Sequence, residues 1–181
     1  LGGKTVGLLL RCMKSYFASG RYVVLDSGFC VLKGIVELQK RRFFAAALIK
    51  KCRYWPTKVP GDAMRQHFDE EEVKVGDTDA IQGTMDGVIY NLWGMKEPDY
   101  VMRMMATGGA LLSDDTCRST TRTWVKNGLD VVRTFTYLFP FDWHFRFRHA
   151  INNHNNLRHT LPSIEDTWLT RRWEVRVFLF S

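Results

Sequence analysis

Apolar residues recur along the chain with two kinds of spacing, and these spacings predict where helices and strands alternate. In residues 5–17 they fall at helical intervals, and residues 30–42 repeat the same amphipathic pattern. Residues 21–29 and 43–50 are instead short, continuous apolar runs, which are typical of buried strands. The first part of the chain is therefore predicted to alternate helix, strand, helix and strand.

Polar sequence then separates this part from the next apolar segments. Residues 68–79 form an acidic stretch that is predicted to be a loop, whereas residues 86–96 and 100–107 have strand character. Residues 110–127 are polar and weakly patterned. From residue 129 to residue 139 the apolar spacing predicts a helix, and Pro140 is expected to start or kink the next one.

The order of these elements predicts an α/β fold with a mixed sheet, in a single domain over residues 1–181. Hydrophobic residues make up 45% of the chain, which is enough for a packed core and argues against disorder. The longest apolar runs, VGLLL and FFAAALI, are far shorter than the about 20 residues that a membrane helix needs. No membrane partner is therefore expected. Because residue 1 is Leu rather than Met, the chain is expected to be an incomplete fragment.

The charge of the chain is basic. Lys and Arg number 26 against 19 Asp and Glu, a formal charge of +7. The basic residues occur in short clusters, which favours a polyanion such as nucleic acid as partner; an ordinary solvated basic surface is the alternative. The four cysteines include no CxxC pair, so we expect reduced thiols in an intracellular protein.

Residues 148–159, RHAINNHNNLRH, are too polar for a core segment. The histidines in and before this segment recur every five residues, at His144, His149, His154 and His159. On a helix, neighbours at this spacing point about 140° apart, so they do not share one face. A structural zinc site is not predicted from them.

Four segments together resemble the transposase core of the piggyBac family and its domesticated derivatives. They are VVLDSGFCVLKGIVELQKR (23–41), AALIKKCRYWP (46–56), MKEPDYVMRMMAT (95–107) and RHAINNHNNLRHTLPSIEDTW (148–168). The resemblance implies a ribonuclease-H-like mixed sheet flanked by helices, a nuclear location, and an ancestral enzyme that cut DNA with three aspartates and two divalent metals.

The resemblance also implies which positions carried the acids. Asp26, after the run YVVL, matches the first aspartate at the end of a central strand; the alternative is an Asp that only ends a strand or caps a helix. The second aspartate is expected after residue 107, where Gly108 stands. The third is expected on a helix where this chain has Asn152, with Asn153 beside it.

Two-metal phosphoryl transfer explains why such losses matter. Each ion needs hard oxygen ligands, and carboxylates also offset the four positive charges of two Mg²⁺ ions. An Asn keeps one ligand oxygen and loses the charge. We therefore predict a catalytically inactive transposase remnant with Asp26 as its retained acid and no bound metal cofactor, although active relatives use Mg²⁺.

Two other interpretations remain open. The chain is an active transposase if Asp26 is joined by a relocated acid, Asp114 or Asp115, and by a remote one such as Glu165. It is an interaction module if the fold is used without DNA.

Non-specific DNA binding is predicted to use basic residues near the ancestral active site. They are Lys50, Lys51, Arg53, Arg146, Arg148 and Arg158. The aromatic residues that alternate with two of these arginines, Trp143, Phe145 and Phe147, are expected to include core residues rather than only base-stacking ones.

Overall fold

The computed structural model describes residues 3–50, 55–56, 59–108 and 117–160. The chain divides into two units, residues 1–146 and residues 147–181. The elements in chain order are α1 (Gly3–Met13), η1 (Lys14–Tyr16), β1 (Tyr22–Leu25), η2 (Ser27–Phe29), α2 (Leu32–Lys40), β2 (Phe44–Leu48), α3 (Gly61–Asp69), β3 (Thr78–Met85), β4 (Val88–Lys96), β5 (Val101–Thr107), β6 (Ser119–Lys126), β7 (Leu129–Thr136) and α4 (Phe139–Thr160).

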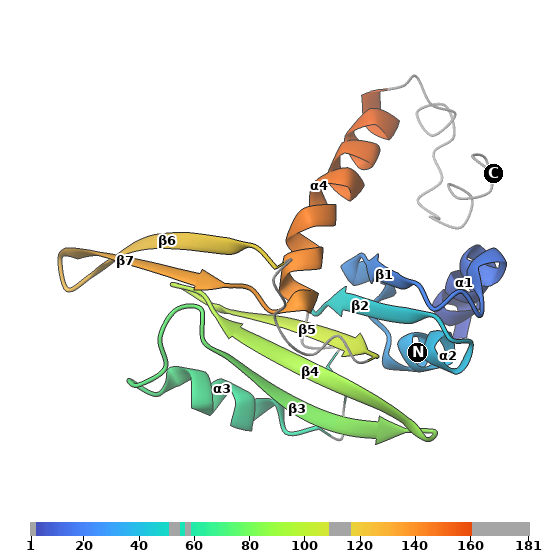
Figure 1. The fold of residues 1–181 in the computed structure, drawn as a ribbon, viewed down its shortest axis with the longest axis horizontal. Helices are drawn as coiled ribbons and strands as arrows, with labels where there is room; N and C mark the ends of the chain where they lie inside the picture. The colour runs from blue at the N-terminus through green and yellow to red at the C-terminus, as the bar shows by residue number, and fades with distance from the viewer. Residues whose placement is uncertain (1–2, 51–54, 57–58, 109–116, 161–181) are drawn as a thin grey trace. The chain divides into compact units, whose positions relative to one another are not determined.

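Five strands form one mixed sheet in the order β1-β2-β5-β4-β3 (Figure 1). Strands β1 and β2 are parallel and are connected through α2, whereas β2 to β5, β5 to β4 and β4 to β3 are antiparallel. A parallel pair requires such a crossover because the chain must return to the same end of the sheet. This is the predicted fold class, and it is consistent with a fragment of a ribonuclease-H-like fold.

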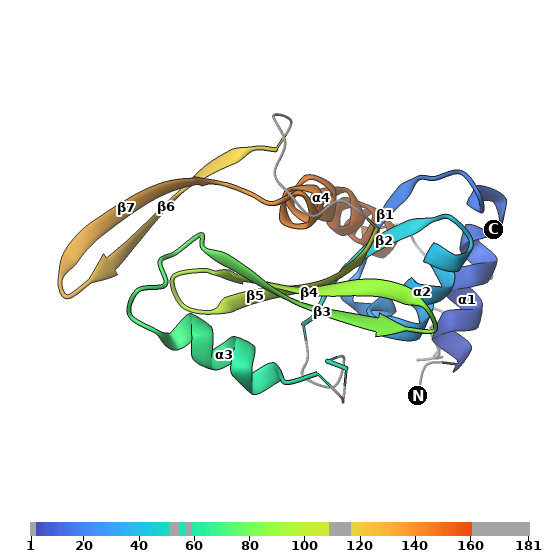
Figure 2. The same cartoon turned by 60° about the horizontal axis from the view of Figure 1, so that its bottom comes forward.

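Apolar side chains cover both faces of the sheet. On one face the strands pack against α1 and α2, through a cluster that includes Leu9, Ile35, Leu38, Ala45, Ala47, Leu92 and Met105. The opposite face packs against the residues around the start of α4, through a cluster that includes Ala46, Met95, Met104, Ala106, Tyr137 and Phe141. Figure 2 shows α3 below the sheet and the first turns of α4 above it.

Helix α3 approaches the sheet closely at one glycine. The Phe68 ring lies directly over Gly94 of β4, and a Cβ at this position would overlap the ring. Phe68 and Met64 of α3 are both buried. Gly94 therefore sets how closely α3 packs on this face of the sheet.

Strands β6 and β7 form a separate two-stranded hairpin. Its turn is Asn127-Gly128, with φ values of 54° and 78°, as a two-residue turn between antiparallel strands requires. Arg122 and Arg133 lie directly opposite each other on the inward face. Two like charges in this position destabilise a hairpin unless each has a partner of opposite charge.

Each arginine of the hairpin binds a carboxylate at the edge of the large sheet. Arg122 donates to both oxygens of Glu97, at 2.9 and 3.1 Å, and to the hydroxyl of Tyr137 at 2.7 Å. Arg133 donates to Asp77 at 2.8 Å and to the carbonyl oxygen of Val75. Glu97 is buried, and its hydrogen bonds raise the pKa of the Arg122 guanidinium above its ordinary value.

The sequence predictions succeeded for the apolar elements and failed for the polar ones. The helix expected over residues 129–139 is wrong, because residues 129–136 form β7. Strand β6 lies in the stretch where no element was predicted, and the stretch expected to be an acidic loop contains the end of α3 and the start of β3. In the hairpin, inward positions are occupied by arginines as well as apolar residues, which hides the two-residue period of a strand.

None of the described helices is both long enough and apolar enough to span a membrane.

We predict that Arg122→Met destabilises the protein by about 3 kcal/mol, because it leaves the buried carboxylate of Glu97 without its charged partner. The free energy of unfolding is measured by denaturant titration. Arg65→Met is the matched control, since its ion pair with Asp69 is exposed and 3.7 Å long, and it should change stability by less than about 0.5 kcal/mol. Equal effects of the two substitutions would contradict the anchoring role of Arg122.

Candidate functional site

Asp26 lies at the point where β1 ends. The apolar strand stops at Leu25, and Asp26 caps the short helix η2 by accepting a hydrogen bond from the backbone N–H of Ser27 at 2.7 Å. The Ser27 hydroxyl lies 3.4 Å from the same carboxylate oxygen. Asp26 is exposed, and its second carboxylate oxygen has no hydrogen-bond partner among the described residues. One oxygen thus caps the short helix, and the other makes no hydrogen bond within the described residues.

Two sequence-predicted residues share one edge of the sheet. Because β1 and β2 are parallel, Asp26 after β1 and Lys50 after β2 emerge at the same end of the two strands. The backbone N–H of Ile49 still pairs with the carbonyl oxygen of Arg103, so the chain stays aligned with β5 up to this point. Lys50 is exposed. Asp26 and Lys50 therefore both follow this end of the two strands, which we call the Asp26 edge.

The structure places Asp26 on an edge strand rather than a central one. Strand β1 has β2 as its one neighbour in the described sheet, and β2 and β5 lie further in. The resemblance implies a central strand for this acid, whereas β1 lies at the edge of the sheet formed by the described strands.

Gly108 lies at the opposite end of the sheet from Asp26. Leu25 is level with Ala47, and Ala47 is level with Met105, but β5 runs antiparallel to β1. Gly108 therefore follows β5 at the opposite end of the sheet. It lies about 13 Å from Asp26 along the strand direction and about 10 Å from it across the sheet, which is two strand spacings. Ligands of two metals about 4 Å apart do not span this distance. The structure therefore does not bring Gly108 into one site with Asp26.

The local backbone at Gly108 also disfavours an ancestral aspartate. Its φ is +86°, a conformation that side chains with a Cβ rarely adopt. A Cβ there would come within 2.6 Å of the Phe44 ring of β2. Position 108 is suited to glycine for steric reasons, which is a different explanation from the loss of a catalytic acid.

The third predicted position lies on α4. Asn152 and Asn153 are within its helical residues, and the side chain of Asn153 is exposed. Arg158 is on the same helix. The side chains of Asn152 and Arg158 lie outside the described residues, as do Lys51, Arg53, Asp114, Asp115 and Glu165 entirely.

Arg146 forms an ion pair with a buried acid that was not predicted from the sequence. It forms an ion pair with Asp142, one helical turn earlier, at 2.6 Å, and Arg118 binds the other oxygen of the same carboxylate at 2.7 Å. Asp142 is completely buried. Its place after Pro140, in the first turn of a helix, was the available signal, since acids are favoured there. Arg146 thus has a structural role, although it is exposed, as Arg148 is.

Other acids of the sheet are also engaged. Glu97 and Asp77 bind the two hairpin arginines, and sequence reasoning had assigned neither a role. Within the described residues no group of three or more His, Cys, Asp or Glu side chains is placed to hold a metal ion.

Cys30 lies four residues after Asp26 and is fully buried beneath α1 and α2. Burial raises the pKa of its thiol to about 12. It is therefore protonated at neutral pH and unsuited to act as a nucleophile. Cys12 is exposed and Cys30 is buried, and both are free thiols.

We predict that Gly108→Asp destabilises the protein by about 2–4 kcal/mol, because the substituted residue meets both the backbone strain and the Phe44 ring. Gly20→Asp is the control: its φ is +67°, but the space around it is open, so about 1 kcal/mol is expected. Thermal unfolding of both variants provides the comparison. A Gly108→Asp variant as stable as the parent chain would restore the interpretation that an aspartate once stood there.

Comparison of the sequence with known proteins gives one result, a match to a family of transposases. No curated protein and no solved structure matches the chain significantly. The family model described as Transposase IS4, a family of DDE transposases, matches residues 2–181. This match covers nearly the whole chain, including both the Asp26 edge and α4. The chain therefore belongs to the transposase IS4 family.

Proposed function

We propose that this chain is a piggyBac-type transposase-derived domain that has lost DNA cleavage and retains non-specific DNA affinity in the nucleus. The observation that carries the proposal is which residues stand at the expected acid positions. Asp26 stands at the end of β1, whereas α4 has the amides Asn152 and Asn153 where the resemblance expects acids. Gly108 is not part of this argument, because it lies at the other end of the sheet.

Replacing a metal-binding carboxylate by an amide removes a negative charge, and this loss is large enough to weaken metal binding substantially. A unit charge 4 Å from another contributes about 4 kcal/mol at an effective dielectric constant of about 20, and a divalent ion doubles this. Dehydration of the ion cancels much of that value. If about 2 kcal/mol remains, replacing one acid by an amide weakens metal binding about 30-fold. Asp26 alone is then a poor ligand set for Mg²⁺ at cellular concentration.

Residual DNA affinity would come from the exposed cations near the same residues. Lys50 is exposed at the Asp26 edge, and Arg148 is exposed on α4. Phosphate contacts by such residues are independent of sequence and weaken with salt. Arg146 is a weaker candidate than the sequence suggested, because its guanidinium is bound to the buried Asp142.

We predict that the chain does not nick supercoiled plasmid DNA in Mn²⁺, and that Asn152→Asp binds Mn²⁺ about 30-fold more tightly in calorimetric titration. Asn127→Asp is the matched control: it makes the same chemical change at the hairpin turn, where Asp tolerates the positive φ of 54°. Its Mn²⁺ affinity should equal that of the parent chain.

Nicking by the unmodified chain would show that the domain is an active transposase, and would favour a relocated acid such as Asp114 or Asp115. An Asn152→Asp variant with unchanged Mn²⁺ affinity would show that position 152 is not a lost metal ligand.

A second prediction addresses the DNA surface. Binding of a labelled duplex oligonucleotide, followed by fluorescence anisotropy, should weaken linearly with the logarithm of salt concentration, and Lys50→Glu should reduce that slope by about 1. Lys4→Glu, at an exposed position of α1, makes the same charge change and should leave the slope unaltered. Absence of salt-dependent binding would favour a role without DNA.

A further inference from the structure

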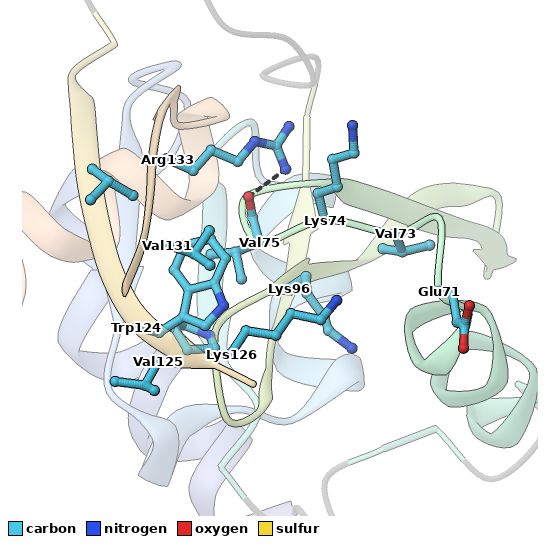
Figure 3. Close-up of a pocket in the computed structure, with 12 residues that line it drawn as sticks. Glu71, Val73, Lys74, Val75, Lys96, Trp124, Val125, Lys126, Val131 and Arg133 are labelled. Carbon is cyan, nitrogen blue, oxygen red and sulfur yellow. Dashed lines mark hydrogen bonds between the residues drawn. The ribbon is translucent and has the colours of Figure 1, made fainter. Parts of the chain in front are cut away.

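A pocket of about 610 Å³ opens between the outer half of the β6–β7 hairpin and the segment that joins α3 to β3 (Figure 3). We call it the hairpin pocket. Its volume lies within the range of known ligand sites. It belongs to the first unit of the chain and is separate from the Asp26 edge, and the proposed DNA role makes no use of it.

The walls of the hairpin pocket are held in place. Arg133 of β7 binds Asp77 and the carbonyl oxygen of Val75, which ties the hairpin to the opposite wall. The ring of Phe135 packs against Gly76, where a side chain would not fit. The pocket is therefore a feature of the packed structure, built by side-chain contacts on both walls.

The hairpin wall is apolar and partly uncovered. Trp124 and Val131 form a cross-strand pair that faces the pocket. Trp124 and Val131 are each partly exposed there. Val125 and Val132, which are 68% and 62% exposed, alternate with them along the strands and lie on the outer face of the hairpin. A partly exposed apolar pair in a concave wall is typical of protein-interaction sites, whereas surfaces that bind nucleic acid are more polar.

The charged groups around the pocket are of both signs. Lys74, Lys96 and Lys126 line it, and Figure 3 shows the side chains of Lys96 and Lys126 extending toward the same side. Glu71 lies on the α3 side, next to the exposed acids of residues 69–72. Arg133 adds little net charge, because Asp77 offsets it.

We propose that the hairpin pocket binds a peptide segment of a protein partner, in which a large apolar side chain is flanked by acidic residues. The apolar side chain would pack on Trp124 and Val131, and one carboxylate would pair with Lys126. A second carboxylate would pair with Lys96, whose ammonium group also donates to the carbonyl oxygen of Phe68. A nucleic acid fits less well, since a continuous phosphate backbone would be repelled at the Glu71 side. A peptide can place acidic residues at the lysines and leave the Glu71 side neutral or basic.

Fluorescence anisotropy with defined peptides tests the proposal on the full chain. The probe is a fluorescein-labelled nonapeptide with a central Phe and Glu on both sides of it. Comparison peptides replace Phe by Ala or every Glu by Lys, and a single-stranded oligonucleotide is the nucleic-acid arm. The Glu-Phe-Glu peptide should bind most tightly, and each replacement should weaken it.

Two variants locate the site. Lys126→Glu, at the exposed end of β6, should weaken binding of the acidic peptide about fivefold to tenfold, because a rim charge is reversed. Trp124→Ala should weaken it at least as much, because the apolar wall is lost. Lys4→Glu on α1 is the charge-matched control and should bind like the parent chain. Circular dichroism confirms that each variant is folded.

The proposal is overturned if the acidic and basic peptides bind equally, if none of the peptides binds, or if Lys126→Glu binds the acidic peptide as well as the parent chain does. An oligonucleotide that binds more tightly than the peptide and loses affinity in Lys126→Glu would assign the pocket to nucleic acid instead. Loss of DNA binding in Lys50→Glu alone leaves this proposal unaffected.

Discussion

Two arginines that face each other across the β6–β7 hairpin are the constraint on which the arrangement of this domain depends. Arg122 and Arg133 would repel one another, and the fold resolves this by giving each a carboxylate from the large sheet, Glu97 and Asp77. The two ion pairs offset the repulsion between the arginines and also attach the hairpin to the large sheet. A two-stranded hairpin is only marginally stable by itself. Its fixed position, and with it the hairpin pocket, follows from these two ion pairs.

The direction of the strands decides which residues can act together. The parallel pair β1 and β2 brings Asp26 and Lys50 to one edge, and the antiparallel β5 takes Gly108 to the other. A transposase family member that had lost several metal ligands would still keep this topology, because the apolar clusters on the two faces hold it independently of the site. The fold of this chain therefore does not depend on its metal ligands, and a fold by itself does not determine a function.

How much of the structure the sequence predicts depends on where the apolar residues are. Strands β1, β2, β4 and β5 and helix α2 were predicted because their buried faces are almost purely apolar. Strand β7 was mistaken for a helix because Arg133 occupies an inward position. The place of Asp26 at the end of a strand was predicted from the apolar run before it, whereas its role as a metal ligand comes from the resemblance and stays a prediction. The location of Gly108 was not predictable, since the relative direction of β1 and β5 depends on pairings between distant segments. Glu97 lies in a short segment between two predicted strands, where no local signal points to a partner as distant as Arg122.

The strand order has a further consequence for how the domain assembles. Strand β1 joins the described sheet only through β2, and β2 is completed only when β5 pairs with its other edge, more than 50 residues later in the chain. Contacts of such long sequence separation form late and slowly. In a nascent chain that ends before residue 101, β2 has β1 but not β5 as a hydrogen-bonded neighbour. The segment around Asp26 then follows a two-stranded pair that is not yet part of the larger sheet. The geometry of that acid is therefore decided by a folding step that takes place far along the sequence.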